Sequence, residues 1–106
     1  MLDVEVVTRE QVKAGLAEGS IALIDVREPH EFAAGHIPGA TTMPLSRFDP
    51  SQLPRDPGKR IVFCCRSGRR TLQAIEMARM MGRSDACAHY AGSMLDWVGS
   101  GEPVEL

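Results

Sequence analysis

One cysteine in this chain is followed by a run of residues that favours a reactive thiolate. Cys65 ends an apolar segment, and the residues after it are Arg66, Ser67, Gly68, Arg69, Arg70 and Thr71. Gly68 lets the backbone curl, so that successive N–H groups point inward and form a site for an anion. The arginines add positive charge, which also attracts an anionic substrate. The pattern predicts a lowered pKa for Cys65 and a nucleophilic sulfur.

The elements on either side of Cys65 place it at the edge of a sheet. Residues 61–64 are all apolar, as expected of a strand buried on both faces, and residues 71–81 predict a helix. Ligands bind beyond the carboxyl ends of parallel strands, and a helix N-terminus favours an anion there. The polar residues of the helix form one narrow stripe, so deep packing is expected for the rest. The apolar residues in question are Leu72, Ala74, Ile75, Met77, Ala78 and Met81.

The remaining sequence alternates strand and helix patterns. Strands are expected at residues 4–7, 21–26, 40–43 and 87–90, and short helices after Pro29 and around residues 94–97. Thr8 and Gln11 have the spacing of a capping box, and Gly19 is expected to end the helix that they begin. Residues 44–60 predict mostly loop, with one short helix. The alternation predicts one α/β domain over residues 1–106, with a small parallel β-sheet flanked by helices on both faces.

Composition excludes several classes of protein. The 106 residues include 12 basic and 14 acidic side chains, for a net charge of -2, which disfavours nucleic acid as a partner. No segment approaches the roughly 18 apolar residues needed to cross a membrane, and residues 1–10 lack the pattern of a secretory signal. Three cysteines, two of them adjacent, suit neither a disulfide framework nor a zinc site. Reduced thiols and a cytoplasmic location are expected.

The loop from Cys65 to Thr71 resembles the active-site loop of the rhodanese family. Residues 25–28, 31–32 and 35–40 resemble the family's first signature, and Gly92 with Trp97 resembles its C-terminal signature. These features keep the expected order and spacing over residues 24–97. Ser93 is a departure, since the family usually has a second glycine there.

The resemblance implies a three-layer rhodanese-like fold and a sulfurtransferase activity. Cys65 would attack a sulfane sulfur, as in thiosulfate, and become a persulfide that the loop N–H groups stabilise. Cyanide or a thiol would then remove the sulfur. Residues 66–71 would bind the substrate, and neither a metal nor a cofactor is implied. The partners would be these small molecules, and a sulfur-relay protein is a further candidate.

Residues outside the loop have plainer interpretations. Asp25, Arg27 and His36 are interpreted as supporting residues, because the resemblance suggests polar pairs that hold the loops. Acid or substrate-anchor roles for Asp25 and Arg27 are the alternative. Trp97 is expected to anchor the C-terminal helix, with a wall of the site as the other possibility.

The remaining cysteines and histidines are interpreted as packing or surface residues. Alternation along a strand points the side chain of Cys64 away from that of Cys65, so a packed thiol is favoured over a redox role. Cys87 is expected to pack in the core. His30 and His89 lie in no recognisable site context.

Two other functions are open from the sequence. Phosphatases and arsenate reductases also use a cysteine loop for oxyanions, but their arginine lies six residues after the cysteine, where this chain has Thr71. A binding or regulatory module with an inactive site is the non-enzyme alternative, although such modules usually lose the cysteine. A dedicated sulfur carrier for one partner protein is compatible with the same loop.

Overall fold

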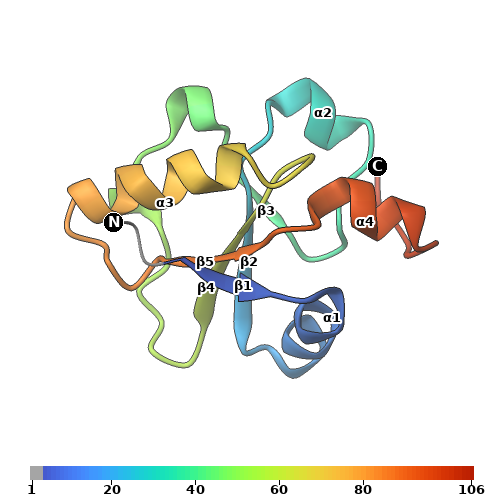
Figure 1. The fold of residues 1–106 in the computed structure, drawn as a ribbon, viewed down its shortest axis with the longest axis horizontal. Helices are drawn as coiled ribbons and strands as arrows, with labels where there is room; N and C mark the ends of the chain where they lie inside the picture. Colours follow the sequence, from blue (N-terminus) through green and yellow to red (C-terminus); the bar gives the residue numbers. More distant parts are fainter. Residues whose placement is uncertain (1–3) are drawn as a thin grey trace.

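The described part of the chain, residues 4–106 of a computed structural model, forms one parallel sheet with helices on both faces (Figure 1). The strands are β1 (Glu5–Val7), β2 (Ile21–Asp25), β3 (Thr41–Thr42), β4 (Arg60–Cys64) and β5 (Ala88–Tyr90). They lie in the order β1-β5-β4-β2-β3, and every paired neighbour is parallel. The helices are α1 (Arg9–Glu18), α2 (Pro29–Ala33), α3 (Arg70–Met80) and α4 (Ser93–Gly99). The predicted α/β class is confirmed.

Two hydrophobic clusters fill the space between the sheet and its helices. One lies against α1 and α4 and includes Val12, Leu23, Cys64 and Trp97. The other lies against α3 and includes Phe63, Cys65 and Ile75. Adjacent residues of β4 therefore enter different clusters, as alternation along a strand requires. The sheet is covered on both faces, which explains why the middle residues of β2 and β4 are all apolar.

The ends of α1 form as the sequence predicts. The Thr8 side chain accepts from the Gln11 amide, the Gln11 side chain accepts from the Thr8 amide, and Gly19 ends the helix in a left-handed conformation at φ 74°. Between β3 and β4 the structure has two short 3₁₀ helices, Leu45–Arg47 and Pro50–Gln52, where one short helix was predicted. No helix within residues 4–106 is long and apolar enough to cross a membrane.

The deep packing expected for six apolar residues of α3 and its C-cap is wrong for three of them. Ala74, Ile75 and Ala78 are buried, but Leu72, Met77 and Met81 are 40, 36 and 64% exposed. The helix has the sheet on one side only, so the side chains on its other face meet solvent. Met77 and Met81, with Met80, instead line a shallow pocket beside Phe48 and Pro50.

Candidate active site

Cys65 follows the last residue of β4, where the strand passes into the loop that precedes α3. This is the carboxyl edge of the sheet, which is where ligands bind in open parallel sheets. Its side chain is 1% exposed, and the loop wraps around it. The position is the one that the sequence predicts for a reactive cysteine.

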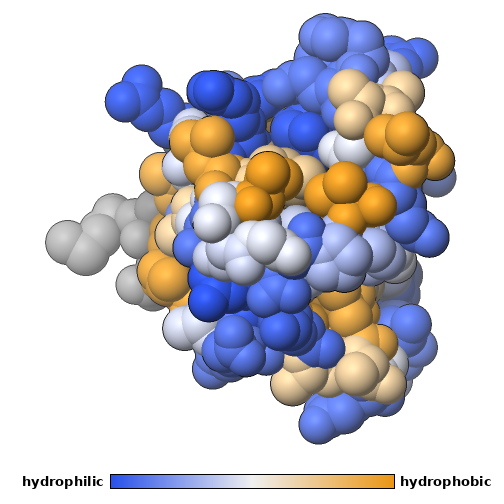
Figure 2. Space-filling model, turned by 90° about the vertical axis from the view of Figure 1, so that its right-hand side faces the viewer, coloured by the Kyte–Doolittle hydropathy of each residue, from blue (hydrophilic) through white to orange (hydrophobic). Residues whose placement is uncertain are grey.

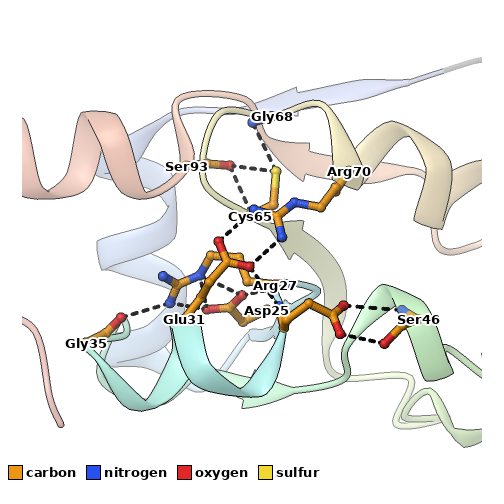
Figure 3. Close-up of polar contacts among 10 residues, drawn as sticks. Asp25, Arg27, Glu31, Gly35, Ser46, Cys65, Gly68, Arg70 and Ser93 are labelled. Carbon is orange, nitrogen blue, oxygen red and sulfur yellow. Dashed lines mark hydrogen bonds and ion pairs between the residues drawn. The ribbon is translucent and has the colours of Figure 1, made fainter.

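The backbone of the loop forms an anion site around the Cys65 sulfur. The Gly68 amide donates to Sγ at 3.1 Å (Figure 3). Burial raises the pKa of Cys65, but hydrogen bonds from the amides of Thr71, Gly68, Ser67 and Arg70 stabilise the thiolate more, and the pKa lies below its ordinary value. The backbone therefore favours the thiolate, as predicted from the composition of the loop.

Gly68 is required at its position for two reasons. Its φ is 88°, a conformation that L side chains rarely adopt. A Cβ atom there would lie 2.4 Å from the Ala91 carbonyl oxygen. The loop therefore curls against the turn between β5 and α4, and only a residue without a side chain fits this contact.

Ser93, the departure from the family pattern, is in contact with Cys65. Among residues 4–106 it is the single non-glycine residue with a positive φ, at 49°, so the backbone keeps the conformation that a glycine would adopt. The buried hydroxyl accepts from the Cys65 amide at 3.1 Å (Figure 3). It donates to the Tyr90 carbonyl at 2.8 Å. The Ser93 oxygen lies 3.9 Å from the Cys65 sulfur. The serine thus fixes the backbone of the cysteine.

The three loop arginines have different surroundings. The Arg70 guanidinium binds both oxygens of Glu31 on α2, at 2.6 and 2.9 Å (Figure 3). Arg70 holds the pKa of Glu31 down to about 2, although desolvation opposes this. Arg66 and Arg69 are exposed, and no carboxylate of residues 4–106 forms an ion pair with either. The concentrated positive charge expected here is therefore partly offset by Glu31, a residue that the sequence analysis did not place at the site.

Asp25 and Arg27 form a buried ion pair at the carboxyl end of β2. The Arg27 guanidinium lies 2.8 Å from Asp25 and also donates to the Gly35 carbonyl at 2.8 Å, which ties β2 to the turn after α2 (Figure 3). His36, in that turn, lies 3.0 Å from the Phe32 carbonyl and stacks on the Phe32 ring. These contacts suit the supporting roles expected for the three residues.

His89 lies next to the loop, although its sequence context gave no sign of this position. It sits on β5, and its Nδ1 is 2.7 Å from the Thr71 hydroxyl. The same hydroxyl lies 2.9 Å from the Gly68 carbonyl, to which it can donate. Thr71, expected to bind substrate, therefore turns its side chain into the protein interior, while its amide faces Cys65. The missing information was the strand order, which makes β5 the neighbour of β4.

The side chains of Cys64, Cys87 and Trp97 have no contact with the Cys65 sulfur among the hydrogen bonds of residues 4–106. Cys64 is fully buried in the cluster on the α1 side, where desolvation raises its pKa well above normal, and Cys87 is partly buried. Trp97 donates from its indole to the Pro103 carbonyl at 2.7 Å, an anchor for the C-terminal segment. No group of three potential metal ligands occurs within residues 4–106.

An apolar groove of about 680 Å³ begins beside the loop and runs between α2 and α4. Arg66 lies at the end next to Cys65, and Leu95, Val98 and Val104 line the rest. The α4 wall is joined to the site, because the Leu95 amide donates to the Arg66 carbonyl at 3.0 Å. Figure 2 shows hydrophobic side chains gathered across the face that carries α4 and the C-terminus.

Comparisons with known proteins agree with this geometry. The model of the rhodanese-like domain matches residues 8–100. An uncharacterized Synechocystis protein is 41% identical over 82% of this chain. The match covers 48% of that protein, so this chain spans about half of its length. The human thiosulfate:glutathione sulfurtransferase is 33% identical over 87% of this chain and 91% of its own length. A rhodanese-related protein from Thermoplasma volcanium superposes with a TM-score of 0.79 at 26% identity, over 96% of this chain and 98% of that one.

Proposed function

The chain belongs to the rhodanese-like domain family, and on that premise we propose that it is a sulfurtransferase whose Cys65 carries the sulfur. The donor would be an anionic sulfane sulfur compound such as thiosulfate, and the acceptor cyanide or a thiol. The observation that carries the proposal is the Cys65 sulfur, held in a ring of backbone amides that lowers its pKa. Named relatives that transfer sulfur from thiosulfate support the choice of donor.

In the first step, the Cys65 thiolate attacks the outer sulfur of thiosulfate. A new S–S bond forms to Cys65, the S–S bond of thiosulfate breaks, and its electron pair leaves with sulfite. The persulfide keeps one negative charge on its terminal sulfur. The amides that stabilise the thiolate can also stabilise this charge, because it lies only one bond further out.

In the second step, the acceptor attacks the terminal sulfur of the persulfide. With cyanide the products are thiocyanate and the Cys65 thiolate, and with a thiolate they are a persulfide of the acceptor and the same thiolate. Charge is conserved in each case, so no external oxidant or reductant is needed. The scheme predicts ping-pong kinetics. A sulfur-relay protein that offers its own cysteine would use the same step.

The proposed location is the cytoplasm, since all three cysteines are free thiols and none lies in a disulfide. A reducing compartment also keeps Cys65 available for attack. The proposed chemistry needs neither a metal nor an organic cofactor, because the sulfur atoms carry the bonds that form and break.

Phosphoryl or arsenate chemistry is the less favoured alternative. An arginine six residues after the cysteine would clamp the oxyanion in such enzymes, and this chain has Thr71 there, with its hydroxyl turned toward Gly68 and His89. The Arg70 guanidinium, one position earlier, is bound by Glu31. A loop of this kind suits a sulfur atom better than a tetrahedral oxyanion.

A turnover assay with thiosulfate and cyanide tests the proposal. Wild-type protein should release thiocyanate, Cys65→Ser should release none above background, and Cys64→Ala should resemble wild type. Replacing cyanide with glutathione tests the thiol acceptor in the same way. Thiocyanate release by Cys65→Ser at the wild-type rate would contradict the proposal.

A further inference from the structure

His89 and Thr71 form a buried pair on the protein side of the Cys65 loop. His89 lies on β5 and is 5% exposed, and Thr71 lies in the first turn of α3 and is fully buried. Their side chains approach closely, with Nδ1 of His89 2.7 Å from Oγ1 of Thr71. Burial lowers the pKa of His89, which favours the neutral imidazole.

Counting protons fixes the direction of the bonds. The Thr71 hydroxyl has one proton and two possible recipients, His89 Nδ1 and the Gly68 carbonyl at 2.9 Å. If the proton goes to His89, the buried Gly68 carbonyl loses this donor. If it goes to Gly68, then His89 must carry a proton on Nδ1 and donate it to Thr71. The second arrangement satisfies all three groups.

The Thr71 hydroxyl links Thr71 to Gly68, and the backbone amides of both residues stabilise the Cys65 sulfur. The Gly68 amide donates to Sγ at 3.1 Å, and the Thr71 amide is the strongest of the backbone donors that lower the pKa of Cys65. A chain of hydrogen bonds therefore runs from the imidazole through the Thr71 hydroxyl to the Gly68 peptide. Such chains strengthen their members and fix their orientation.

We propose that His89 is a positioning residue for the Cys65 loop, whose Nδ1–H holds the Thr71 hydroxyl against the Gly68 carbonyl and so keeps both amides aimed at the sulfur. His89 acts through Thr71 and does not touch the substrate. The effect of His89 on turnover rests on the proposed function, but its effect on the pKa of Cys65 does not. The ionisation of Cys65 can be measured with no substrate present.

The test uses two replacements of His89. Leucine fills a similar volume without a donor, whereas the side-chain amide of asparagine places an N–H near the position of Nδ1. The readout is the midpoint of the pH dependence of Cys65 alkylation, measured by mass spectrometry of the Cys65 peptide. His89→Leu should raise this midpoint by about half a unit or more, a roughly threefold loss of thiolate at any pH well below the midpoint, and His89→Asn should recover most of it. His30→Leu, an exposed histidine on α2, is the matched control and should leave the midpoint unchanged.

A second set of variants separates positioning from packing. Thr71→Val removes the hydroxyl at nearly constant shape, and in that background His89→Leu should shift the midpoint no further. A purely structural histidine would behave differently: the melting temperature would fall in His89→Leu and His89→Asn while the alkylation midpoint stayed at the wild-type value. That result, or additive shifts in the double variant, would overturn the proposal.

One measurement on the wild-type protein needs no variant to fold. The ¹⁵N NMR shifts of His89 at pH 7 report which ring nitrogen carries the proton. The proposal requires the Nδ1–H tautomer, and an imidazole protonated only on Nε2 would overturn it. If Cys65→Ser kept wild-type turnover, the proposed function would fail while the alkylation and NMR results still decided the role of His89.

Discussion

The Arg70 guanidinium and the Glu31 carboxylate bind each other through two hydrogen bonds, of 2.6 and 2.9 Å, at the edge of the Cys65 loop. The pair joins α3 to α2 across 39 positions of sequence. Its net charge is near zero, so Arg70 attracts an anionic donor less than an isolated arginine would. Removing Arg70 alone, however, leaves a carboxylate beside the thiolate.

The first prediction follows from the unpaired Glu31 carboxylate that remains when Arg70 is removed. Arg70→Ala should lower kcat/KM for thiosulfate by about tenfold or more, equivalent to roughly 1.4 kcal/mol, because the uncovered Glu31 repels the dianionic donor. Adding Glu31→Gln to Arg70→Ala should recover most of the loss. Steady-state kinetics at low and high salt would check both, since screening should shrink the effect. Arg47→Ala removes an exposed arginine elsewhere and serves as the control. A double variant as slow as the single one would contradict this account.

The same pair should make stability depend on pH in acid. The pKa of Glu31 is lowered from 4.5 to about 2, so the unfolded chain takes up a proton at higher pH than the folded one. The stabilisation, about 1 kcal/mol for a partly exposed pair, is fully present above pH 4.5 and is lost as pH falls toward 2. Urea unfolding of wild type and Glu31→Gln should therefore give a difference that is constant at neutral pH and vanishes near pH 2. A difference that persists at pH 2 would show that the lost contact is not electrostatic.

Cys64 should prove dispensable for chemistry. It is fully buried in the cluster on the α1 side, and its raised pKa keeps it protonated. Cys64→Ala should keep wild-type turnover and lose about 1 kcal/mol of unfolding free energy through the small cavity it leaves. Thiocyanate release and urea unfolding measure the two effects. A folded variant without turnover would mean that the vicinal thiol takes part in transfer.

The Asp25–Arg27 pair should matter for stability through its burial. Asp25→Ala leaves the Arg27 charge in the interior with the Gly35 carbonyl as its remaining partner, which should cost about 3–5 kcal/mol. Replacing both residues, as in Asp25→Ala with Arg27→Met, should cost less, because no charge stays buried. Denaturant unfolding of the two variants gives the comparison. If the single variant were as stable as the double one, the unpaired Arg27 charge would not be the source of the loss.

Local patterns predicted the elements and the candidate nucleophile, because the relevant signals lie within a few residues of one another. The capping box at Thr8 and the strand, cysteine and glycine loop around Cys65 are of this kind. The ion pair between Asp25 and Arg27, two positions apart, agrees with the polar pairing that the family resemblance suggested.

The contacts that the sequence did not disclose join segments that only the fold brings together. Arg70 meets Glu31 across 39 positions, Ser93 meets Cys65 across 28, and His89 meets Thr71 across 18. The last two depend on β5 lying next to β4, and strand order cannot be derived from the periodicity of one chain. The exposed methionines of α3 have the same origin, since periodicity does not say how many layers cover a helix.

The central claim is that Cys65 alone carries the transferred sulfur, and peptide mass spectrometry after incubation with thiosulfate tests it most directly. Protein treated without an acceptor should gain one sulfur atom, about 32 Da by the mass of sulfur, on the peptide of Cys65, because its sulfur alone among the three thiols lies in a ring of amides. Adding cyanide should remove that mass, and Cys65→Ser should gain none. Sulfur found on Cys64 or Cys87 in the wild-type protein, or retained by Cys65→Ser, would contradict the account.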